Sequence, residues 1–355
     1  MPLLLLMLCA VFLAGCATTT TQLAPVARED VRAEESVQRE LVITELARAQ
    51  ERLDNIAYPL MAAATPVCAA KSGPRLGFSL RSAHGYTGVW APAARAALRL
   101  SDTLSVTAVV GGSPAALAGL EKGDRLLAVN GVEIPIARSA VETATKALQG
   151  TSGQPFVLTV RRADGDHQIR AQPEVICNLG AIVTLEGDLN AYADGKSIIF
   201  PWMMMRFAND DELRAVIAHE IAHNAMGHIE ARQKNAALAG FFGLLADVAL
   251  ASQGYNTRGE NTASFMRLGA QAFSQDFERE ADYVGMYIMA RAGVSLTSGP
   301  NLWRQFAQIN PAAIGYASTH PTTAERFVRL RTAIEEIENK RRVGRDLLPE
   351  MKVQR

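Results

Sequence analysis

His219, Glu220 and His223 are the residues of this chain whose types and spacing are best suited to chemistry. Two side chains four residues apart on an α-helix lie one above the other, so both imidazoles can reach one metal ion. Glu220 lies about 100° around the helix axis, where its carboxylate can touch a metal-bound water without ligating the metal. The order His-Glu-x-x-His therefore predicts two zinc ligands and a general base on one helical turn.

The flanking sequence predicts that this turn belongs to a buried helix. Acidic residues at positions 210–212 supply the negative charge that suits a helix start. An apolar stripe follows, made up of Leu213, Val216, Ile217, Ile221 and Ala222. A polar helix with unrelated histidines is the alternative. It is disfavoured because burying a His-Glu-His cluster without a metal would be costly.

A catalytic zinc site needs a third protein ligand. The metzincin pattern requires a His at the place of Ile229 and a Gly at the place of Met226, so that pattern is excluded. His228 lies five residues after His223, roughly 140° off its face on a continuing helix, and would need a turn to reach the metal. We interpret His228 as a helix-end residue.

A later segment with helical periodicity offers carboxylates. Its apolar positions are Phe273, Phe277, Ala281, Val284 and Ile288. Glu278 and Asp282 share one face of this helix, whereas Glu280 points the other way. Glu278 can therefore ligate a metal, and Asp282 can orient a ligating His one turn on. An ordinary acidic helix face is the alternative.

These motifs together resemble the HtpX-like and CAAX-prenyl-protease-like family of gluzincin metallopeptidases. The resemblance covers residues from about 178 to 335 and implies a helical zincin-type fold with one Zn²⁺ per chain. Further matching stretches are Asn190-Ala191-Tyr192-Ala193 with strand 197–200, Ala281-Asp282-Tyr283-Val284-Gly285, and Thr319-His320-Pro321 with Arg326.

The resemblance also implies roles for individual residues. It makes Glu278, rather than Glu280, the third ligand, and it places His320 and Arg326 near the metal. His320 would either stabilise the tetrahedral oxyanion or ligate zinc and hold the enzyme latent, and a surface position is the alternative. The strand Ser197-Ile198-Ile199-Phe200 resembles the family's edge strand, which would pair with an extended substrate; otherwise it is an internal strand.

The N-terminus predicts export. An apolar run over residues 3–14, too short for the roughly twenty residues that span a bilayer, ends in Leu13-Ala14-Gly15-Cys16. This ending resembles the lipobox of bacterial lipoproteins, although no Lys or Arg precedes the run. We expect a signal peptide over 1–16, a lipid on Cys16 and a tether over 17–30. A secretory signal without lipid is the alternative. Ala17 favours an outer-membrane anchor facing the periplasm.

Two cysteines then remain, Cys68 and Cys177. An even pair in an oxidising compartment predicts a disulfide, and two buried free thiols are the alternative. The two residues bracket one sequence block, so a bond between them would clamp the ends of an inserted domain.

The bracketed block, residues 74–174, has the alternating strand-like runs 104–109 and 156–160. Its centre, residues 112–131, closely resembles a PDZ domain. Leu76-Gly77-Phe78 resembles the PDZ loop that receives a peptide C-terminal carboxylate. A PDZ fold that serves only as a spacer or gate is an equal alternative.

Three other segments complete the expected α+β organisation. The metallopeptidase domain is expected over residues 178–340. Residues 31–66 predict an amphipathic helix that packs on this domain, and residues 341–355 predict a charged tail. The apolar stretch 236–251 predicts a buried helix or a flap over the active site, with membrane-surface contact as the less favoured alternative.

Composition limits the function classes. Lys and Arg balance Asp and Glu at 36 each, so no electrostatic footprint for nucleic acid is present. We expect a zinc endopeptidase of the bacterial envelope that acts on misfolded or unassembled envelope polypeptides. A PDZ-bearing envelope chaperone or adaptor with a silent or latent metal site is the alternative.

Overall fold

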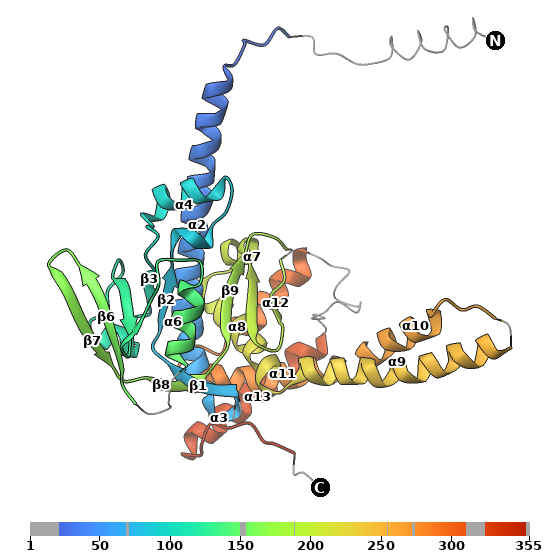
Figure 1. Ribbon diagram of the computed structural model, residues 1–355. Helices are drawn as coiled ribbons and strands as arrows, with labels where there is room; N and C mark the ends of the chain where they lie inside the picture. Colours follow the sequence, from blue (N-terminus) through green and yellow to red (C-terminus); the bar gives the residue numbers. More distant parts are fainter. Residues whose placement is uncertain are drawn as a thin grey trace, which may run out of the picture.

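Helix α2 (Arg28–Ala63) supports the two domains of the chain and projects beyond them at its N-terminal end (Figure 1). The computed structural model describes residues 21–68, 71–149, 154–187, 189–253, 255–271, 274–309 and 324–352. Buried side chains of α2 begin at Ile43 and continue through Leu53 and Leu60. The predicted N-terminal helix thus packs through its C-terminal half.

Polar side chains of α2 bind both domains. The Gln50 amide donates to the backbone oxygen of Ala181 at 2.8 Å and accepts from the backbone nitrogen of Val183 at 2.9 Å, both in the C-terminal domain. Four residues later, Asp54 accepts a 2.6 Å hydrogen bond from Ser79 in the inserted domain. Helix α2 is therefore a shared wall, whereas the sequence predicted contact with the metallopeptidase domain alone.

The inserted domain is an antiparallel sheet with its own apolar core. Its strand order is β2-β3-β4-β6-β7, with β5 paired to β4. The strands are β2 (Phe78–Arg81), β3 (Ser105–Val109), β4 (Arg125–Val129), β5 (Val132–Glu133), β6 (Phe156–Arg162) and β7 (Gly165–Ala171). The helices are α4 (Trp90–Leu98), α5 (Pro114–Leu117) and α6 (Ala140–Leu148), with a 3₁₀ turn at Ala83–Gly85. Phe156, Leu158 and Val160 alternate inward along β6 and are buried, as a strand with one face on a core requires.

The entry and exit of this domain lie side by side. Strand β1 (Ser72–Arg75) pairs antiparallel with β8 (Glu174–Cys177). Next to this pair, a disulfide joins Cys68, in the short helix α3 (Thr65–Cys68), to Cys177, with the Cα atoms 5.5 Å apart. The two ends of the inserted domain are thus held at one point on the C-terminal domain.

The C-terminal domain is mainly helical around a small sheet. Its three strands, in the order β10-β11-β9, are β9 (Gly180–Thr184), β10 (Tyr192–Ala193) and β11 (Ser197–Pro201). Its packed helices are α7 (Trp202–Phe207), α8 (Asp210–Ala225), α11 (Ser274–Arg291), α12 (Ser298–Ile309) and α13 (Ala324–Arg342). The predicted α+β class, a helical domain plus a β-rich domain, is confirmed.

The described part of the predicted charged tail, up to residue 352, folds back on α13. The buried Lys340 ammonium lies 2.6 Å from the backbone oxygen of Leu348 and 2.7 Å from the carboxylate of Glu350. Tyr283 of α11 accepts a 3.0 Å hydrogen bond from the backbone nitrogen of Glu350.

A helical hairpin protrudes from the C-terminal domain. It consists of α9 (His228–Ser252) and α10 (Glu260–Gln271), which contact each other along their length (Figure 1). The prediction that residues 236–251 form a buried helix or a flap over the active site is wrong. The hairpin points away from the body, and most of its large apolar side chains are exposed.

The disulfide generates a stability prediction. A bond that closes a sequence separation of 109 residues restricts the unfolded chain strongly. The double variant Cys68→Ala/Cys177→Ala should therefore lose about 2–4 kcal/mol of unfolding free energy, measured by urea denaturation under oxidising conditions. Wild type treated with reductant is the matched control and should lose a similar amount. An unchanged urea midpoint in both samples would contradict a stabilising role.

Candidate metal centre

Helix α8 begins with a reciprocal cap that fixes its start. Asn209 accepts a 3.0 Å hydrogen bond from the backbone nitrogen of Glu212, and the Glu212 carboxylate accepts one of 3.0 Å from the backbone nitrogen of Asn209. Glu212 is itself buried and accepts a 2.7 Å bond from Gln305 of α12. This cap anchors the helix nearly three turns before His219.

Helix α11 crosses α8 at His219, and a glycine permits the close approach. A Cβ atom at Gly285 would lie 3.3 Å from the backbone of Ala218 and 3.3 Å from the backbone nitrogen of His219. Because the helices meet here, residues one and two turns earlier on α11 lie opposite the two histidines. Those residues are Asp282 and Glu278.

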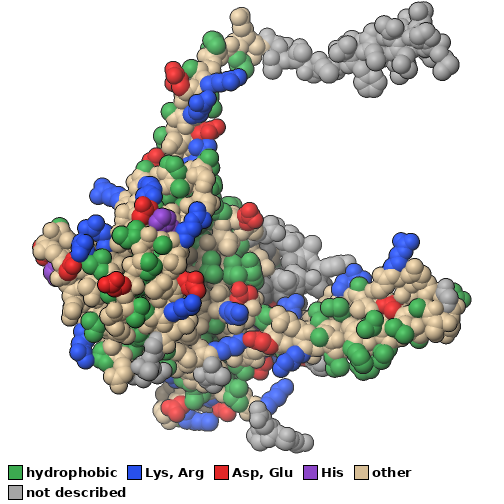
Figure 2. Space-filling view, in the orientation of Figure 1, with side chains coloured by type: hydrophobic (Ala, Val, Ile, Leu, Met, Phe, Trp, Pro, Cys, Tyr) green, Lys and Arg blue, Asp and Glu red, His purple; other side chains and the backbone are tan. Residues whose placement is uncertain are grey.

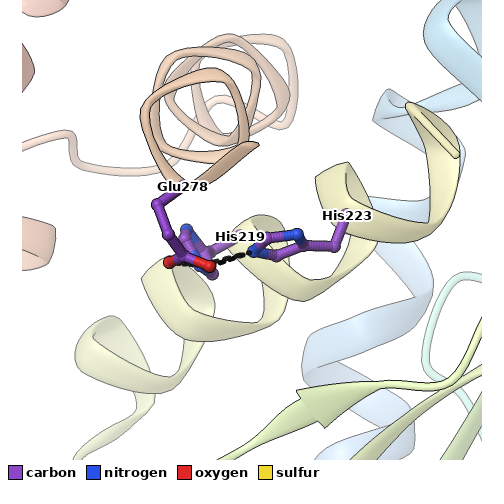
Figure 3. Close-up of side chains that lie close together, drawn as sticks. All are labelled: His219, His223 and Glu278. Atoms are coloured by element: carbon purple, nitrogen blue, oxygen red, sulfur yellow. Dashed lines mark hydrogen bonds and ion pairs between the residues drawn. The ribbon is translucent and has the colours of Figure 1, made fainter. Parts of the chain in front are cut away.

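Three donor groups converge at this crossing (Figure 3). The Nε2 atoms of His219 and His223 lie 3.0 Å apart. The Glu278 carboxylate oxygens lie 3.4 Å from Nε2 of His219 and 3.3 Å from Nε2 of His223. The structure therefore brings together the three residues that the sequence predicts as metal ligands.

The donor set fits a zinc ion. Zinc binds imidazole nitrogen and carboxylate oxygen at about 2.0–2.2 Å, and ligands at the corners of a tetrahedron of that size lie roughly 3.4 Å apart. The three separations in the site, 3.0 to 3.4 Å, are close to this value. A fourth position would be left for water or substrate, as in catalytic zinc sites.

Asp282 and Arg326 support the first histidine. The Asp282 carboxylate lies 2.9 Å from Nδ1 of His219 and accepts a 2.5 Å hydrogen bond from Arg326. The Arg326 guanidinium is buried and lies 3.5 Å from the ring centroid of Trp303. Asp282 thus lies where the sequence predicts a carboxylate that orients His219. Arg326, predicted as catalytic, contacts the Nδ1 side of His219, away from the donor atoms, so the geometry assigns it a positioning role through Asp282.

His228 supports the second histidine, a role that the sequence interpretation missed. Helix α8 ends at Ala225, and Gly227, with φ +72°, turns the chain directly before α9, so His228 at the start of α9 faces back towards His223. Its Nδ1 lies 3.0 Å from Nδ1 of His223, and its Nε2 lies 2.8 Å from the Glu280 carboxylate. The glycine directly before His228 is the signal that could have indicated this turn.

One proton arrangement satisfies this chain. If Nε2 of His223 faces a metal, its Nδ1 carries the proton and donates to Nδ1 of His228. His228 then donates from Nε2 to Glu280. Each ligating histidine is therefore backed by a carboxylate, His219 directly by Asp282 and His223 through His228.

The electrostatics of the two ligating histidines differ. Burial alone would lower the pKa of His219, but its hydrogen bonds with Asp282 and Glu278 raise that pKa to about 9. Burial lowers the pKa of His223 below its ordinary value. In the metal-free site at neutral pH, His219 thus carries a proton on both ring nitrogens, and a metal ion would replace the proton on Nε2.

Glu220 lies on the same turn as both histidines and is 1 % exposed. It is not one of the three converging donors, as its place about 100° around the helix from His219 requires. This placement suits a general base beside the metal.

The predicted substrate strand differs from expectation. Strand β11, which contains Ser197, Ile198, Ile199 and Phe200, is the central strand of its sheet, parallel to β9 and antiparallel to β10. The edge-strand prediction for 197–200 is therefore wrong, because strand partners are set by contacts remote in sequence. In the described part of the sheet, β9 and β10 are the two outer strands. The backbone of β9 is bonded to Gln50 of α2, whereas Tyr192 on β10 is exposed.

The remaining predicted site residues have varied positions. Leu76 is buried, Gly77 adopts φ +78°, and Phe78 starts β2, an outer strand of the described sheet. His320 and Cys16, the predicted catalytic and lipidation residues, lie outside the described residues.

Comparison with known proteins finds two family matches. Residues 177–334 match the sequence model of Peptidase family M48, and residues 105–162 match that of the PDZ domain. The predicted resemblance to a metallopeptidase family is therefore confirmed for the C-terminal domain, and the PDZ resemblance for the inserted domain.

Individual relatives carry related names. "Mitochondrial metalloendopeptidase OMA1" of Arabidopsis thaliana is 31% identical over 149 residues, which cover 41% of this chain and 29% of that protein. "Beta-barrel assembly-enhancing protease" of Escherichia coli O157:H7 is 28% identical over 156 residues, covering 41% of this chain and 32% of that protein. The chain thus spans less than half the length of these curated relatives.

Part of this chain is similar to a solved structure. The HtrA3 PDZ domain bound to a phage-derived ligand is 25% identical, with a TM-score of 0.23, and the alignment covers 30% of this chain and 88% of that one.

The prediction of a metalloendopeptidase agrees with the family match and with the names of the curated relatives.

The raised pKa of His219 predicts how pH changes stability. A histidine whose pKa rises from 6.5 to about 9 on folding stabilises the fold below pH 6.5 and loses this contribution as pH rises through 9. Metal-free protein should therefore lose on the order of 3 kcal/mol between pH 6.5 and 9.5, measured by urea unfolding with a chelator. Zinc-loaded protein should not lose this contribution, since zinc replaces the proton. Parallel pH profiles with and without zinc would contradict the assignment.

The link through His228 predicts a loss of zinc affinity. His228→Phe keeps an aromatic ring against Phe277, which His228 stacks on, but removes the partner of His223. Competition with a chromophoric chelator should show zinc affinity lowered about 10–100-fold. Glu280→Gln should have a smaller effect in the same direction. His84→Phe, which changes a histidine of the inserted domain, is the control and should bind zinc like wild type. Equal affinity in all four proteins would exclude a positioning role.

Proposed function

We propose that this chain, whose residues 177–334 match Peptidase family M48, is a zinc-dependent endopeptidase of the bacterial cell envelope that cleaves misfolded or unassembled envelope polypeptides. The observation that carries the proposal is the convergence of His219, His223 and Glu278 at tetrahedral spacing, with Glu220 on the same buried turn. A scaffold protein has no need of a base next to an open zinc position, which disfavours a chaperone with a silent site.

The mechanism assigns a separate task to each residue. Zinc, when bound, supplies a position that lowers the pKa of a water towards about 7 and polarises a carbonyl oxygen. Glu220 takes the proton of the attacking water and passes it to the nitrogen of the leaving amine. Asp282 and His228 keep the two imidazoles in the tautomer that presents Nε2 to the metal.

An extended substrate would add to an exposed strand edge. Of the two outer strands in the described part of the C-terminal sheet, β9 is bonded to Gln50 of α2, so we place the substrate backbone along Tyr192 and Ala193 of β10. His320, outside the described residues, keeps its proposed role as an oxyanion donor or as a latent ligand.

The inserted domain supports capture of peptide termini. Its outer strand β2, which follows Leu76-Gly77-Phe78, borders a cavity of about 420 Å³. Helix α2 and strand β9 also line the cavity, and β9 belongs to the C-terminal domain. A peptide C-terminus paired with β2 would therefore lie against the domain that carries the metal centre.

Two features support the envelope location. The disulfide between Cys68 and Cys177 is typical of oxidising compartments. The predicted lipid on Cys16 would hold the chain at a membrane, with the outer membrane favoured, and the exposed start of α2 would extend from that anchor as a spacer.

Replacing Glu220 tests the proposal. Glu220→Gln keeps the size of the side chain but cannot accept a proton, so zinc content and unfolding free energy should stay unchanged. Hydrolysis of an unfolded casein substrate should fall at least 100-fold, in the range typical of lost general base catalysis. Glu230→Gln, on a half-exposed carboxylate outside the site, is the matched control. Zinc-loaded Glu220→Gln that cleaves at the wild-type rate would refute the mechanism.

A further inference from the structure

The hairpin of α9 and α10 is an apolar surface that the proposed peptidase reaction does not use. Helix α9 protrudes from the body (Figure 1) and is a candidate membrane span by length and composition alone. Only 17% of its most apolar 18-residue stretch is buried. Core helices of this composition are ordinarily buried, so the exposure needs a physical reason.

The exposed side chains of α9 form one continuous apolar face. Its members are Leu238, Phe241, Phe242, Leu244, Leu245 and Val248, each at least 50% exposed. At 100° per residue they fall within an arc of about 160° around the helix axis. Figure 2 shows hydrophobic side chains gathered on the hairpin accordingly.

The opposite face of α9 is closed by α10 at very short range. A Cβ atom at Gly240 would lie 2.4 Å from the Met266 side chain, and one at Gly243 would lie 2.7 Å from the backbone of Asn261. Small residues let the two helices touch, as they do in helix pairs packed within lipid. The hairpin is therefore a rigid unit whose outer face stays uncovered.

The single charge of the stretch is turned inward. Asp247 is 8% exposed and is the only charged residue of 236–251, all of which the structure describes. Its carboxylate accepts hydrogen bonds from Asn261 at 2.9 Å and from the backbone and hydroxyl of Thr262 at 2.9 and 2.6 Å. The outer face thus presents only alkyl and phenyl groups.

These features favour lipid over a protein partner. A protein interface of this size carries a polar rim and about one hydrogen bond per 100–200 Å², and the outer face offers no side chain that could form one. Lipid acyl chains form no hydrogen bonds, and the helix can contact them because its backbone groups are hydrogen-bonded within the helices. Exposed Arg232 and Lys234 at the base, and Arg258 at the tip, suit anionic headgroups.

Length decides how the hairpin meets the membrane. The 16 residues of 236–251 extend about 24 Å, less than the roughly 30 Å of a hydrocarbon core. The tip also carries Asn256 and Arg258, which would be costly to pass through the core. A hairpin lying along the interface satisfies both constraints.

We propose that the α9–α10 hairpin is a membrane-binding element that lies in the interface of a phospholipid bilayer, with Phe241, Phe242 and Leu245 among the acyl chains. It is separate from the predicted lipid on Cys16. Because α9 starts at His228, beside the metal centre, the hairpin would hold that centre at a fixed height above the lipid surface.

Depth-dependent fluorescence quenching tests the proposal in the full zinc-loaded chain. Vesicles of phosphatidylethanolamine and phosphatidylglycerol are prepared with ordinary or brominated acyl chains, and bromine quenches only tryptophan that contacts those chains. Phe242→Trp places the reporter on the outer face, and Leu117→Trp, 82% exposed on α5, is the matched control. Emission of the three native tryptophans is subtracted using wild type. This design stays valid if the N-terminus is itself bound to the vesicles.

The added emission of Phe242→Trp should fall by roughly half or more in brominated vesicles, whereas that of Leu117→Trp should not change. Leu245→Trp gives a second reporter on the same face and should behave like Phe242→Trp. Equal emission of both reporters in brominated and ordinary vesicles would overturn the proposal. If that emission is also blue-shifted without lipid, a second copy or another polypeptide covers the face instead.

Discussion

The crossing of α8 and α11 is the constraint on which the metal centre depends. Three polar donors lie in an apolar interior there, where uncompensated charge is costly. The close contact at Gly285 lets one helix supply two imidazoles while the other supplies a ligand and an orienting carboxylate. Everything around the crossing holds it in register: the cap of α8, the shared wall α2, and Arg326 between Asp282 and Trp303. A shift of either helix would separate the donors.

Local spacing explains why most of the centre could be predicted from the sequence. His219 and His223 share one helix face, and Glu278 and Asp282 share another, since the face of a helix follows from residue number alone. The meeting of the two faces was implied by the family resemblance, because helix packing depends on contacts remote in sequence. The contact of His228 with His223 was not predicted in this way, because Gly227 interrupts the helical path and redirects the chain. Helical periodicity holds only as far as the helix does.

Two predictions failed because they depended on contacts remote in sequence. The family resemblance predicted β11 as an edge strand, but β9 and β10 flank it on both sides. The sequence of a five-residue strand does not indicate which strands pair with it. The apolar stretch 236–251 has the composition of a core helix. An apolar composition indicates that a helix surface is removed from water, but it does not indicate whether protein or lipid covers that surface. The predicted bounds of the inserted domain, residues 74–174, depend instead on features of the sequence itself, namely turn residues and two bracketing cysteines.

The disulfide and the β1–β8 pair give the inserted domain a modular character. Its chain leaves and re-enters the C-terminal domain at points whose Cα atoms are 5.5 Å apart, a gap that a tight turn can close. The insertion adds its own core without lengthening any helix of the metal centre. Evolution or protein engineering could therefore replace the inserted domain with another domain, or shorten it to a turn, while the helices that hold the donors keep their connectivity. The proposed peptide recognition and the proposed hydrolysis can thus evolve at different rates.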